Sequence, residues 1–342
     1  MQSVVLTGPR EFETVDRDRP SPAPDEVLVA MRRIGICGSD LHYFLHGRIG
    51  DHVVEEPLVL GHESAGEVLE AGSAVSGLSV GDRVTLEPGV PCDTCEYCKA
   101  GEYNLCPDVR FMATPPVDGA FTEYLAWPAD FAYRLPEEVS TAEGALCEPL
   151  SVGVHAVRRG GVTSGDTVVI TGCGPIGFTV MEAARAAGAT TILVSDIVER
   201  KRSVARERGA DAAVDPASVG LADAVSAHTN GRGADVVIEA SGARPAIEAT
   251  TAVACRGGTV VLVGLARDGE IPIDTHEIID NELDVHGSFR FRNAYPTAVE
   301  LLADGTVDLE GIVDFELPLA DLDCAFDRVQ DPEVIKGMIT VE

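Results

Sequence analysis

The segment 167–187 constrains the fold most, because it predicts a strand, a tight turn and a helix in immediate succession. Residues 167–171 are all β-branched, as a strand buried on both faces of a parallel sheet requires, and the alanines at 183–187 suit a helix packed closely on a sheet. Three glycines between them permit the turn, admit a pyrophosphate close to backbone amides and let the helix approach the strand. We therefore predict a dinucleotide site rather than an ordinary βαβ turn. Its turn consists of Gly172, Gly174, Pro175, Ile176 and Gly177.

An acidic residue supports this prediction. A second predicted strand, residues 191–195, ends at Asp196, nineteen residues after Gly177. This carboxylate can accept the ribose hydroxyls of a dinucleotide, and it would repel a 2′-phosphate, so we expect NAD rather than NADP. A basic cluster that follows could offset the repulsion, and its lysine is a candidate coenzyme ligand. The cluster consists of Arg200, Lys201 and Arg202.

Four further apolar segments predict strands at residues 212–214, 235–239, 259–263 and 283–286. With the first two strands they make six, the number in a complete doubly wound dinucleotide fold of the Rossmann type. Glycine-rich turns are expected at residues 231–234 and 256–258. The fold class is therefore α/β.

Length and charge exclude several classes of protein. The chain has 342 residues, enough for two domains, and neither a long apolar run nor a signal-peptide pattern at Met1, so we expect a cytoplasmic protein without a membrane partner. With 26 basic and 56 acidic residues the net charge is −30, which disfavours nucleic acid as a partner. Molar salt shortens the screening length to about 3 Å and would suppress this self-repulsion, so we expect a high-salt cytoplasm.

Four closely spaced cysteines predict a structural metal site. Two residues separate each of the first three, and seven precede the last. Four thiolates close a tetrahedral zinc site and leave no position for a substrate. Disulfides are the alternative, which a reducing compartment disfavours. The four are Cys92, Cys95, Cys98 and Cys106.

A second candidate metal site combines Cys37, His62 and Glu63. A thiolate, an imidazole and a carboxylate can bind Zn²⁺ and leave one coordination position open. Their spacing alone does not show that they meet, because a single Cys or His is more often a buried packing residue.

The glycine pattern around His62 supplies the missing support. Gly61-His62-Glu63, with Gly66, Val68, Gly72, Val75 and 81–84, resembles the signature of the zinc-containing medium-chain dehydrogenase/reductase family. The resemblance implies Cys37 and His62 as catalytic zinc ligands, with Glu63 a direct ligand or one that exchanges with water. It also implies a GroES-like β-rich catalytic domain at 1–150 with a zinc lobe at 90–108, an NAD-binding Rossmann domain at 151–290, and a return to the catalytic domain at 291–342.

Two further segments, 111–119 and 147–156, resemble the polyol branch of that family, the sorbitol and xylitol dehydrogenases. This implies that Glu148 is a zinc ligand or holds its water, whereas Cys147 and His155 are packing residues. Animal sorbitol enzymes usually have tyrosine where this chain has Phe291, which removes one hydroxyl from the substrate site. The other implied substrate residues are Ser39, Tyr43, Phe111, Thr114 and Arg290. Those implied near the nicotinamide are Val263, Gly264, Leu265, Ser288 and Phe289.

The expected reaction is hydride transfer from a secondary alcohol of a polyol to NAD, giving a ketose. Zinc acidifies a bound hydroxyl, Ser39 is the candidate first proton acceptor, and His42 or a water held by Glu148 carries the proton outward. The alternatives are an aldose, threonine or butanediol dehydrogenase of the same family, or a nucleotide-binding protein without catalysis. The resemblance also implies a homotetramer or dimer.

Overall fold

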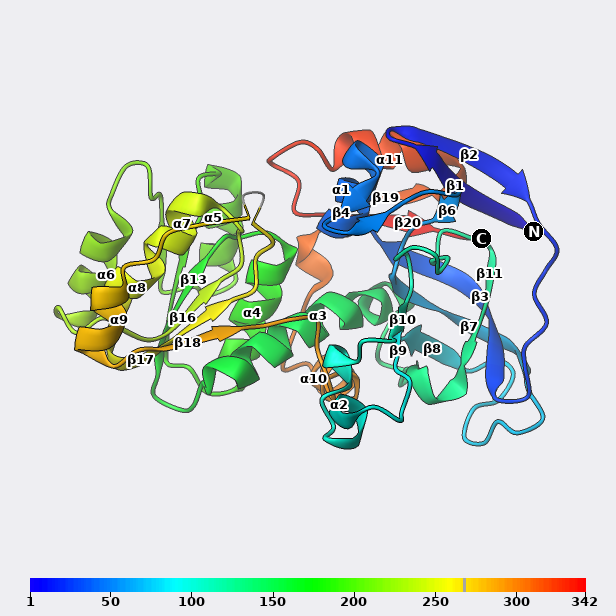
Figure 1. Ribbon diagram of the computed structural model, residues 1–342, viewed down its shortest axis with the longest axis horizontal. Coiled ribbons are helices and arrows are strands. Elements are labelled where there is room, and N and C mark those ends of the chain that lie inside the picture. The colour runs from blue at the N-terminus through cyan, green and yellow to red at the C-terminus, as the bar shows by residue number, and fades with distance from the viewer. Residues whose placement is uncertain (267–268) are drawn as a thin grey trace. The chain divides into compact units, whose positions relative to one another are not determined.

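The computed structural model describes residues 1–266 and 269–342 and divides into two compact units (Figure 1). The first unit comprises Met1–Glu148 and Tyr295–Glu342, and the second comprises Pro149–Ala294. The division therefore falls after residues 148 and 294. Helix α3 (Thr141–Gly160) runs through the first division.

A seven-stranded sheet forms the centre of the first unit. Its strand order is β12-β8-β7-β3-β20-β19, and β11 also pairs with β3. Figure 1 shows the red C-terminal strand β20 beside the blue strand β3, so the last part of the chain completes the sheet begun by the first. The strands are β3 (Glu26–Gly35), β7 (Glu63–Ala71), β8 (Arg83–Leu86), β11 (Tyr124–Pro128), β12 (Ala132–Arg134), β19 (Val313–Pro318) and β20 (Lys336–Thr340).

Smaller elements cover this sheet. A three-stranded sheet has the order β2-β1-β6, and two hairpins are formed by β4 with β5 and by β9 with β10. These strands are β1 (Gln2–Gly8), β2 (Glu11–Asp16), β4 (Arg48–Ile49), β5 (His52–Val53), β6 (Leu58–Val59), β9 (Gly89–Val90) and β10 (Arg110–Phe111). The helices are α1 (Gly38–His46), α2 (Glu96–Lys99), α10 (Tyr295–Ala303) and α11 (Leu322–Arg328).

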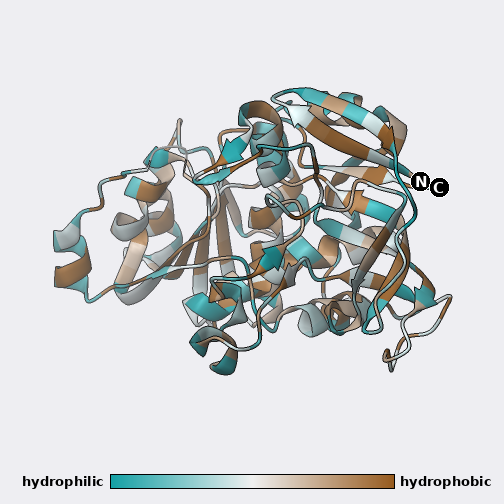
Figure 2. Cartoon of the chain, turned by 45° about the vertical axis from the view of Figure 1, so that its right-hand side comes forward, coloured by the Kyte–Doolittle hydropathy of each residue, from teal (hydrophilic) through white to brown (hydrophobic). Residues whose placement is uncertain are grey.

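The second unit contains six parallel strands in the order β15-β14-β13-β16-β17-β18. This is the doubly wound order 3-2-1-4-5-6, as the sequence predicts. Hydrophobic colour concentrates on these strands in Figure 2, in agreement with their buried valine, isoleucine and leucine side chains. The strands are β13 (Thr167–Thr171), β14 (Thr191–Ser195), β15 (Ala212–Val214), β16 (Ala234–Glu239), β17 (Ala254–Leu262) and β18 (Asp284–Gly287).

Six helices connect or flank these strands among the described residues of the second unit, in addition to its share of α3. Among the helices that the structure describes, none combines the length and the apolar character that crossing a bilayer requires. The six are α4 (Pro175–Ala186), α5 (Glu199–Glu207), α6 (Leu221–Thr229), α7 (Arg244–Glu248), α8 (Thr250–Val253) and α9 (Thr275–Asn281).

One expected turn is wrong. Residues 256–258 lie inside β17, which begins at Ala254. The pairing with β16 shifts between Ala234 and Val236, whose partners are Ala254 and Thr259, so β17 contains extra residues at this point. Gly257 has a φ of 71°, which glycine adopts without strain. The glycines therefore permit an irregularity within a paired strand, where the sequence pattern indicated the end of one.

Candidate active site and metal centres

The three residues of the predicted catalytic metal site meet in the first unit. Cys37, His62 and Glu63 each offer one ligand atom, and these atoms lie within 4.8 Å of one another. Strand pairing explains the convergence, because Gly35 at the end of β3 is the partner of Glu63 at the start of β7. His62 and Glu63 are buried, whereas Cys37 is half-buried at the start of α1. A sulfur, a nitrogen and an oxygen donor so close together form a donor set that suits Zn²⁺.

Asp40 contacts two of the three cluster residues and the backbone next to them. Its carboxylate accepts hydrogen bonds from the backbone N–H of Cys37 at 3.1 Å and of Gly61 at 3.0 Å, and it lies 3.4 Å from Nδ1 of His62. Burial lowers the pKa of His62, but the charges of Asp40 and Cys37 outweigh it and raise that pKa well above 6.5. A metal cation would displace the proton, since only neutral imidazole is a ligand. Asp40 therefore acts as the hydrogen-bond partner that orients the imidazole.

Sequence reasoning missed Lys336, which the tertiary structure brings to the same place. Its side chain is buried, its ammonium group forms an ion pair with Glu63, and it donates a hydrogen bond to the carbonyl of Ile36 at 2.9 Å. The pairing of β20 with β3, in which Met338 is the partner of Gly35, places it there. The available signal was its rarity: Lys336 is one of only three lysines and begins a strand whose other residues are uncharged.

Glu148 lies near this cluster but outside the group whose ligand atoms fall within 4.8 Å. It is buried on α3, and burial is the main cause that raises its pKa to about 7. The charges of His62 and Lys336 lower that pKa, whereas Glu63 raises it. A carboxyl group in this range can either hold or release a proton near neutral pH.

The other predicted residues of the first unit lie on two segments: α1, which begins beside Cys37, and residues 111–114. The ring of Phe111 lies 5.8 Å from that of His62, and Thr114 donates a backbone hydrogen bond to the carbonyl of Phe111 at 3.1 Å. Ser39 and His42 are half-buried on α1, where positions three apart share a face. The buried Tyr43 lies on the same helix.

The four cysteines of the predicted lobe also gather, with their ligand atoms within 4.8 Å of one another. Sγ of Cys98 lies 3.3 Å from that of Cys95 and 4.0 Å from that of Cys92, and all four are free thiols rather than disulfides. Hydrogen bonds from Thr94 lower the pKa of Cys92 to about 6, whereas burial and the neighbouring thiols raise that of Cys98 to about 12. Four sulfur donors at this spacing fit a closed tetrahedral zinc site.

The predicted coenzyme turn lies in the second unit between β13 and α4. Gly172 has a φ of 95°, and a Cβ at Gly177 would lie 1.8 Å from the carbonyl oxygen of Gly172, so both positions require glycine. At Gly174, which precedes the first turn of α4, nothing lies within 4 Å of an added Cβ. Pro175 and Ile176 begin α4 itself. A glycine cradle that opens onto a helix N-terminus fits a pyrophosphate.

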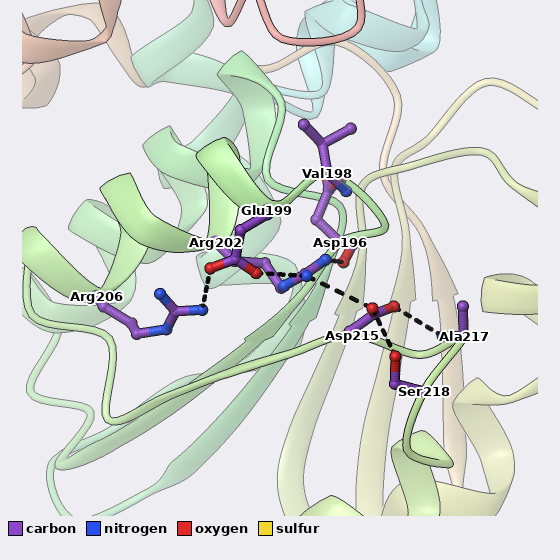
Figure 3. Close-up of polar contacts among 8 residues, drawn as sticks. All are labelled: Asp196, Val198, Glu199, Arg202, Arg206, Asp215, Ala217 and Ser218. Atoms are coloured by element: carbon purple, nitrogen blue, oxygen red, sulfur yellow. Dashed lines mark hydrogen bonds and ion pairs between the residues drawn. The ribbon is translucent and has the colours of Figure 1, made fainter.

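Asp196 is held in place beside this turn (Figure 3). Its two carboxylate oxygens accept backbone hydrogen bonds from Cys173 at 2.7 Å and from Val198 at 2.8 Å. Each oxygen keeps a further lone pair for a ligand hydroxyl. Lys201 is half-buried on α5, one turn further along the chain.

Comparisons with known proteins agree with this geometry. Residues 23–137 match the alcohol dehydrogenase GroES-like domain, and residues 175–304 match the zinc-binding dehydrogenase family. The chain is 44% identical to a sorbitol dehydrogenase of Bacillus subtilis over 328 residues, covering 96% of this chain and 93% of the relative. It is 44% identical to a probable D-xylulose reductase A of Aspergillus terreus, covering 99% and 97%. The chain belongs to the zinc-containing medium-chain dehydrogenase/reductase family.

A solved structure extends the agreement to the whole of this dehydrogenase. A candidate zinc-binding dehydrogenase from Sinorhizobium meliloti 1021, solved with NADP bound, superposes with a TM-score of 0.92 at 34% identity, covering 99% of this chain and 98% of the other. Both units of the present chain therefore have counterparts in one solved dehydrogenase.

The remaining predicted residues of the dehydrogenase lie in its second unit, except Cys147, which belongs to the first unit. The backbone N–H groups of Val263 and Gly264 donate to the carbonyl of Glu239 at 2.9 and 3.0 Å, so the loop after β17 is fixed to the end of β16. Leu265 and Phe289 have exposed side chains, and Ser288 donates its N–H to Leu262. Arg290 has a φ of 52°, its guanidinium lies 4.7 Å from the ring of Phe289, and Phe291 is buried. Cys147 and His155 are buried as well.

A buried carboxylate joins the lobe of the dehydrogenase to the seven-stranded sheet of the first unit. Glu87 accepts hydrogen bonds from the hydroxyl of Tyr103, in the lobe, at 2.8 Å and from that of Tyr133, on β12, at 2.9 Å. Its carbonyl accepts the indole N–H of Trp127 at 2.9 Å. Burial raises the pKa of Glu87 above 4.5, although the two tyrosine hydroxyls act in the opposite direction. Sequence reasoning missed this residue, which belongs to no motif.

Proposed function

We propose that this dehydrogenase oxidises a secondary alcohol of a polyol to a ketone, using NAD as hydride acceptor and zinc as catalytic metal. The observation that carries the proposal is the convergence of Cys37, His62 and Glu63, in a chain 44% identical to a sorbitol dehydrogenase over 96% of its length. The second curated relative, a probable D-xylulose reductase, also carries the name of an enzyme that interconverts a ketose and a polyol.

Two zinc ions have different places in this proposal. Cys37, His62 and Glu63 would hold the catalytic ion, and Glu148, which lies outside their 4.8 Å group, would hold a water beside it. Cys92, Cys95, Cys98 and Cys106 would hold the structural ion. A catalytic zinc supplies a Lewis acid that lowers the pKa of the substrate hydroxyl.

We assign proton transfer and substrate binding to the other predicted side chains of the site. Ser39 accepts the proton of the substrate hydroxyl and passes it to His42, which follows it by one turn of α1. A water held by Glu148 is the second route, because a carboxylate can accept a proton through a bound water and release it to solvent. Bound NAD would supply the acceptor for the hydride from the carbon that carries this hydroxyl. The residues proposed to bind the rest of the polyol are Tyr43, Phe111, Thr114, Arg290 and Phe291.

NAD would bind across the glycine turn of the second unit. The N-terminus of α4 and the open cradle at Gly174 suit its pyrophosphate, and Asp196 suits the two hydroxyls of its adenosine ribose. Val263, Gly264, Leu265, Ser288 and Phe289 are the proposed neighbours of its nicotinamide half, and Lys201 of its ribose.

A substrate panel tests the reaction directly. NADH formation would be followed with xylitol, sorbitol, arabinitol, 2,3-butanediol, threonine and glucose under one set of conditions. We expect kcat/KM for a polyol to exceed that for the diol, because a site that hydrogen-bonds several hydroxyls discriminates against substrates that lack them. Faster oxidation of butanediol, threonine or glucose would contradict the proposed substrate class and support one of those dehydrogenases. If no substrate of the panel gave NADH, the result would support the alternative of a nucleotide-binding protein without catalysis.

Two further proposals concern the net charge of −30 and the oligomeric state that the family resemblance implies. We propose that the protein works in a high-salt cytoplasm, where screening suppresses the repulsion among its 56 acidic residues. Its thermal midpoint should then rise between about 0.1 M and 3 M KCl, and a falling midpoint would contradict this. We also propose a homo-oligomer, a tetramer or a dimer, which light scattering at high salt would test.

A further inference from the structure

A buried arginine lies directly beside the proposed ribose site. Arg202, on α5, has a side chain that is only 8% exposed. Its guanidinium donates to three acceptors: the carbonyl of Asp196 at 2.6 Å, the carboxylate of Glu199 at 2.5 Å and that of Asp215 at 3.5 Å (Figure 3). Arg202 therefore binds the backbone of the same residue whose carboxylate is proposed to select the coenzyme.

Both carboxylates that contact Arg202 are kept ionised by other neighbours. Asp215 accepts hydrogen bonds from the hydroxyl of Ser218 at 2.8 Å and the N–H of Ala217 at 3.0 Å, and these lower its pKa. Glu199 also binds Arg206 at 2.9 Å, and the two arginines lower its pKa. At neutral pH the cation of Arg202 thus faces two full negative charges.

These contacts determine whether Arg202 can bind a phosphate group of the coenzyme. A guanidinium at the end of β14 would attract the 2′-phosphate of NADP, because arginine pairs with phosphate through several N–H groups at once. Here its N–H groups already serve the carbonyl of Asp196 and the carboxylates of Glu199 and Asp215. Although Arg202 belongs to the basic cluster at 200–202, it therefore does not favour binding of NADP.

We propose that Glu199 and Asp215 determine coenzyme specificity by occupying Arg202, in addition to the repulsion that Asp196 exerts itself. The inference deepens the proposed function, since it depends on a dinucleotide bound at Asp196. In the absence of the two carboxylates, Arg202 becomes available to the 2′-phosphate. Glu199, Asp215 and Arg202 then act together. The two carboxylates lower the affinity for NADP only when Arg202 is present.

The test compares direct binding of NAD and NADP, measured by titration calorimetry without substrate at one fixed KCl concentration. We expect the double variant Glu199→Gln/Asp215→Asn to raise the affinity for NADP relative to NAD by about tenfold or more, because two negative charges near the phosphate are removed. Adding Arg202→Gln to that variant should abolish the gain. Glu207→Gln, at the far end of α5, is the matched control and should change the ratio by less than about twofold.

Two outcomes would overturn the inference: a double variant with the same ratio as Glu207→Gln, or a triple variant that keeps the gain. If the double variant does not fold, Glu199→Gln alone replaces it, because the Glu199 side chain is 66% exposed and tolerates the change. Failure of the proposed function looks different. If the proposed function is wrong, the wild-type protein will bind neither NAD nor NADP, or will bind NADP more tightly than NAD, independently of the variants.

Discussion

The two candidate zinc sites of this chain are built in opposite ways. The four thiols of the lobe come from residues 92–106, lie on a short half-exposed loop and need only that loop to meet. Cys37, His62 and Glu63 meet because β3 pairs with β7, and a buried aspartate, lysine and second glutamate surround them. The lobe site is closed by its own ligands, whereas the buried site has charged neighbours beyond any set of metal ligands.

This difference indicates which of the two sites could be catalytic. Four thiolates complete the coordination of zinc and leave nothing for a substrate, so the lobe can only stabilise structure. Three mixed donors leave a position open, and the carboxyl group of Glu148, with its pKa raised to about 7 by burial, stands beside it. Variants at the two sites should therefore fail in different ways.

The largest expected effect is at the buried site. Cys37→Ser or His62→Ala should lower kcat by at least about a thousandfold, because the catalytic metal stabilises the developing charge by several kcal/mol. NAD affinity and the circular dichroism spectrum should not change, since the proposed NAD residues all lie in the second unit. Cys324→Ser, at an exposed thiol, is the control. Near-normal turnover in either ligand variant would eliminate the proposed mechanism.

Cys95→Ser in the lobe should show the opposite pattern. Bound zinc measured by metal analysis should fall from two ions per chain to one, and the thermal midpoint should fall by about 5 °C or more, because a structural zinc contributes directly to folding stability. The enzyme that remains folded should keep a kcat within about threefold of wild type. If its turnover fell as far as that of Cys37→Ser, the division of roles between the sites would be wrong.

The next effect comes from the lysine at the buried site. Lys336→Met removes the cation that pairs with Glu63 and should lower kcat about ten- to a hundredfold, as loss of a residue that orients a metal ligand does. Lys99→Met, at an exposed lysine within the lobe, is the matched control and should leave kcat unchanged. Equal activity of both variants would show that Lys336 contributes only packing. Lys336→Arg tests whether the charge alone restores turnover.

The smallest effect is a pH dependence at the anchor of the lobe. Burial raises the folded-state pKa of Glu87 above its usual 4.5, so the folded protein binds a proton more tightly than the unfolded chain. Its contribution to the free energy of unfolding is therefore present below about pH 4.5 and is lost as pH rises through the raised pKa. Glu87→Gln should remove this dependence in chemical unfolding curves. Identical pH profiles for variant and wild type would show that Glu87 titrates normally.

Local sequence was enough to predict the lobe and the coenzyme turn. The lobe thiols span fifteen residues, from Cys92 to Cys106, and their spacing alone brings the sulfurs together. The glycine turn was equally readable, because a φ of 95° at Gly172 and the approach of Gly177 to its carbonyl are demands on the backbone of six adjacent residues. The six strands of the doubly wound sheet were predicted in the same way, from short apolar segments.

Other features depend on contacts between distant residues, and no local pattern reveals them. Lys336 binds the carbonyl of Ile36, 300 residues earlier, only because β20 inserts beside β3. The turn expected at residues 256–258 was wrong, because these residues form an irregularity within β17, and the strand pairs with β16 on both sides of it. Arg202 is basic in sequence but already paired with carboxylates in the fold.

The sequence by itself determined the elements whose geometry a few neighbouring residues impose: the thiol lobe, the glycine turn, the strands of the doubly wound sheet. Only the tertiary structure decided which charges face one another in the interior, because burial and strand pairing set those distances. That is why the spacing of the lobe cysteines was enough to predict their cluster, whereas the contacts of Asp40, Lys336 and Glu87 could not be predicted.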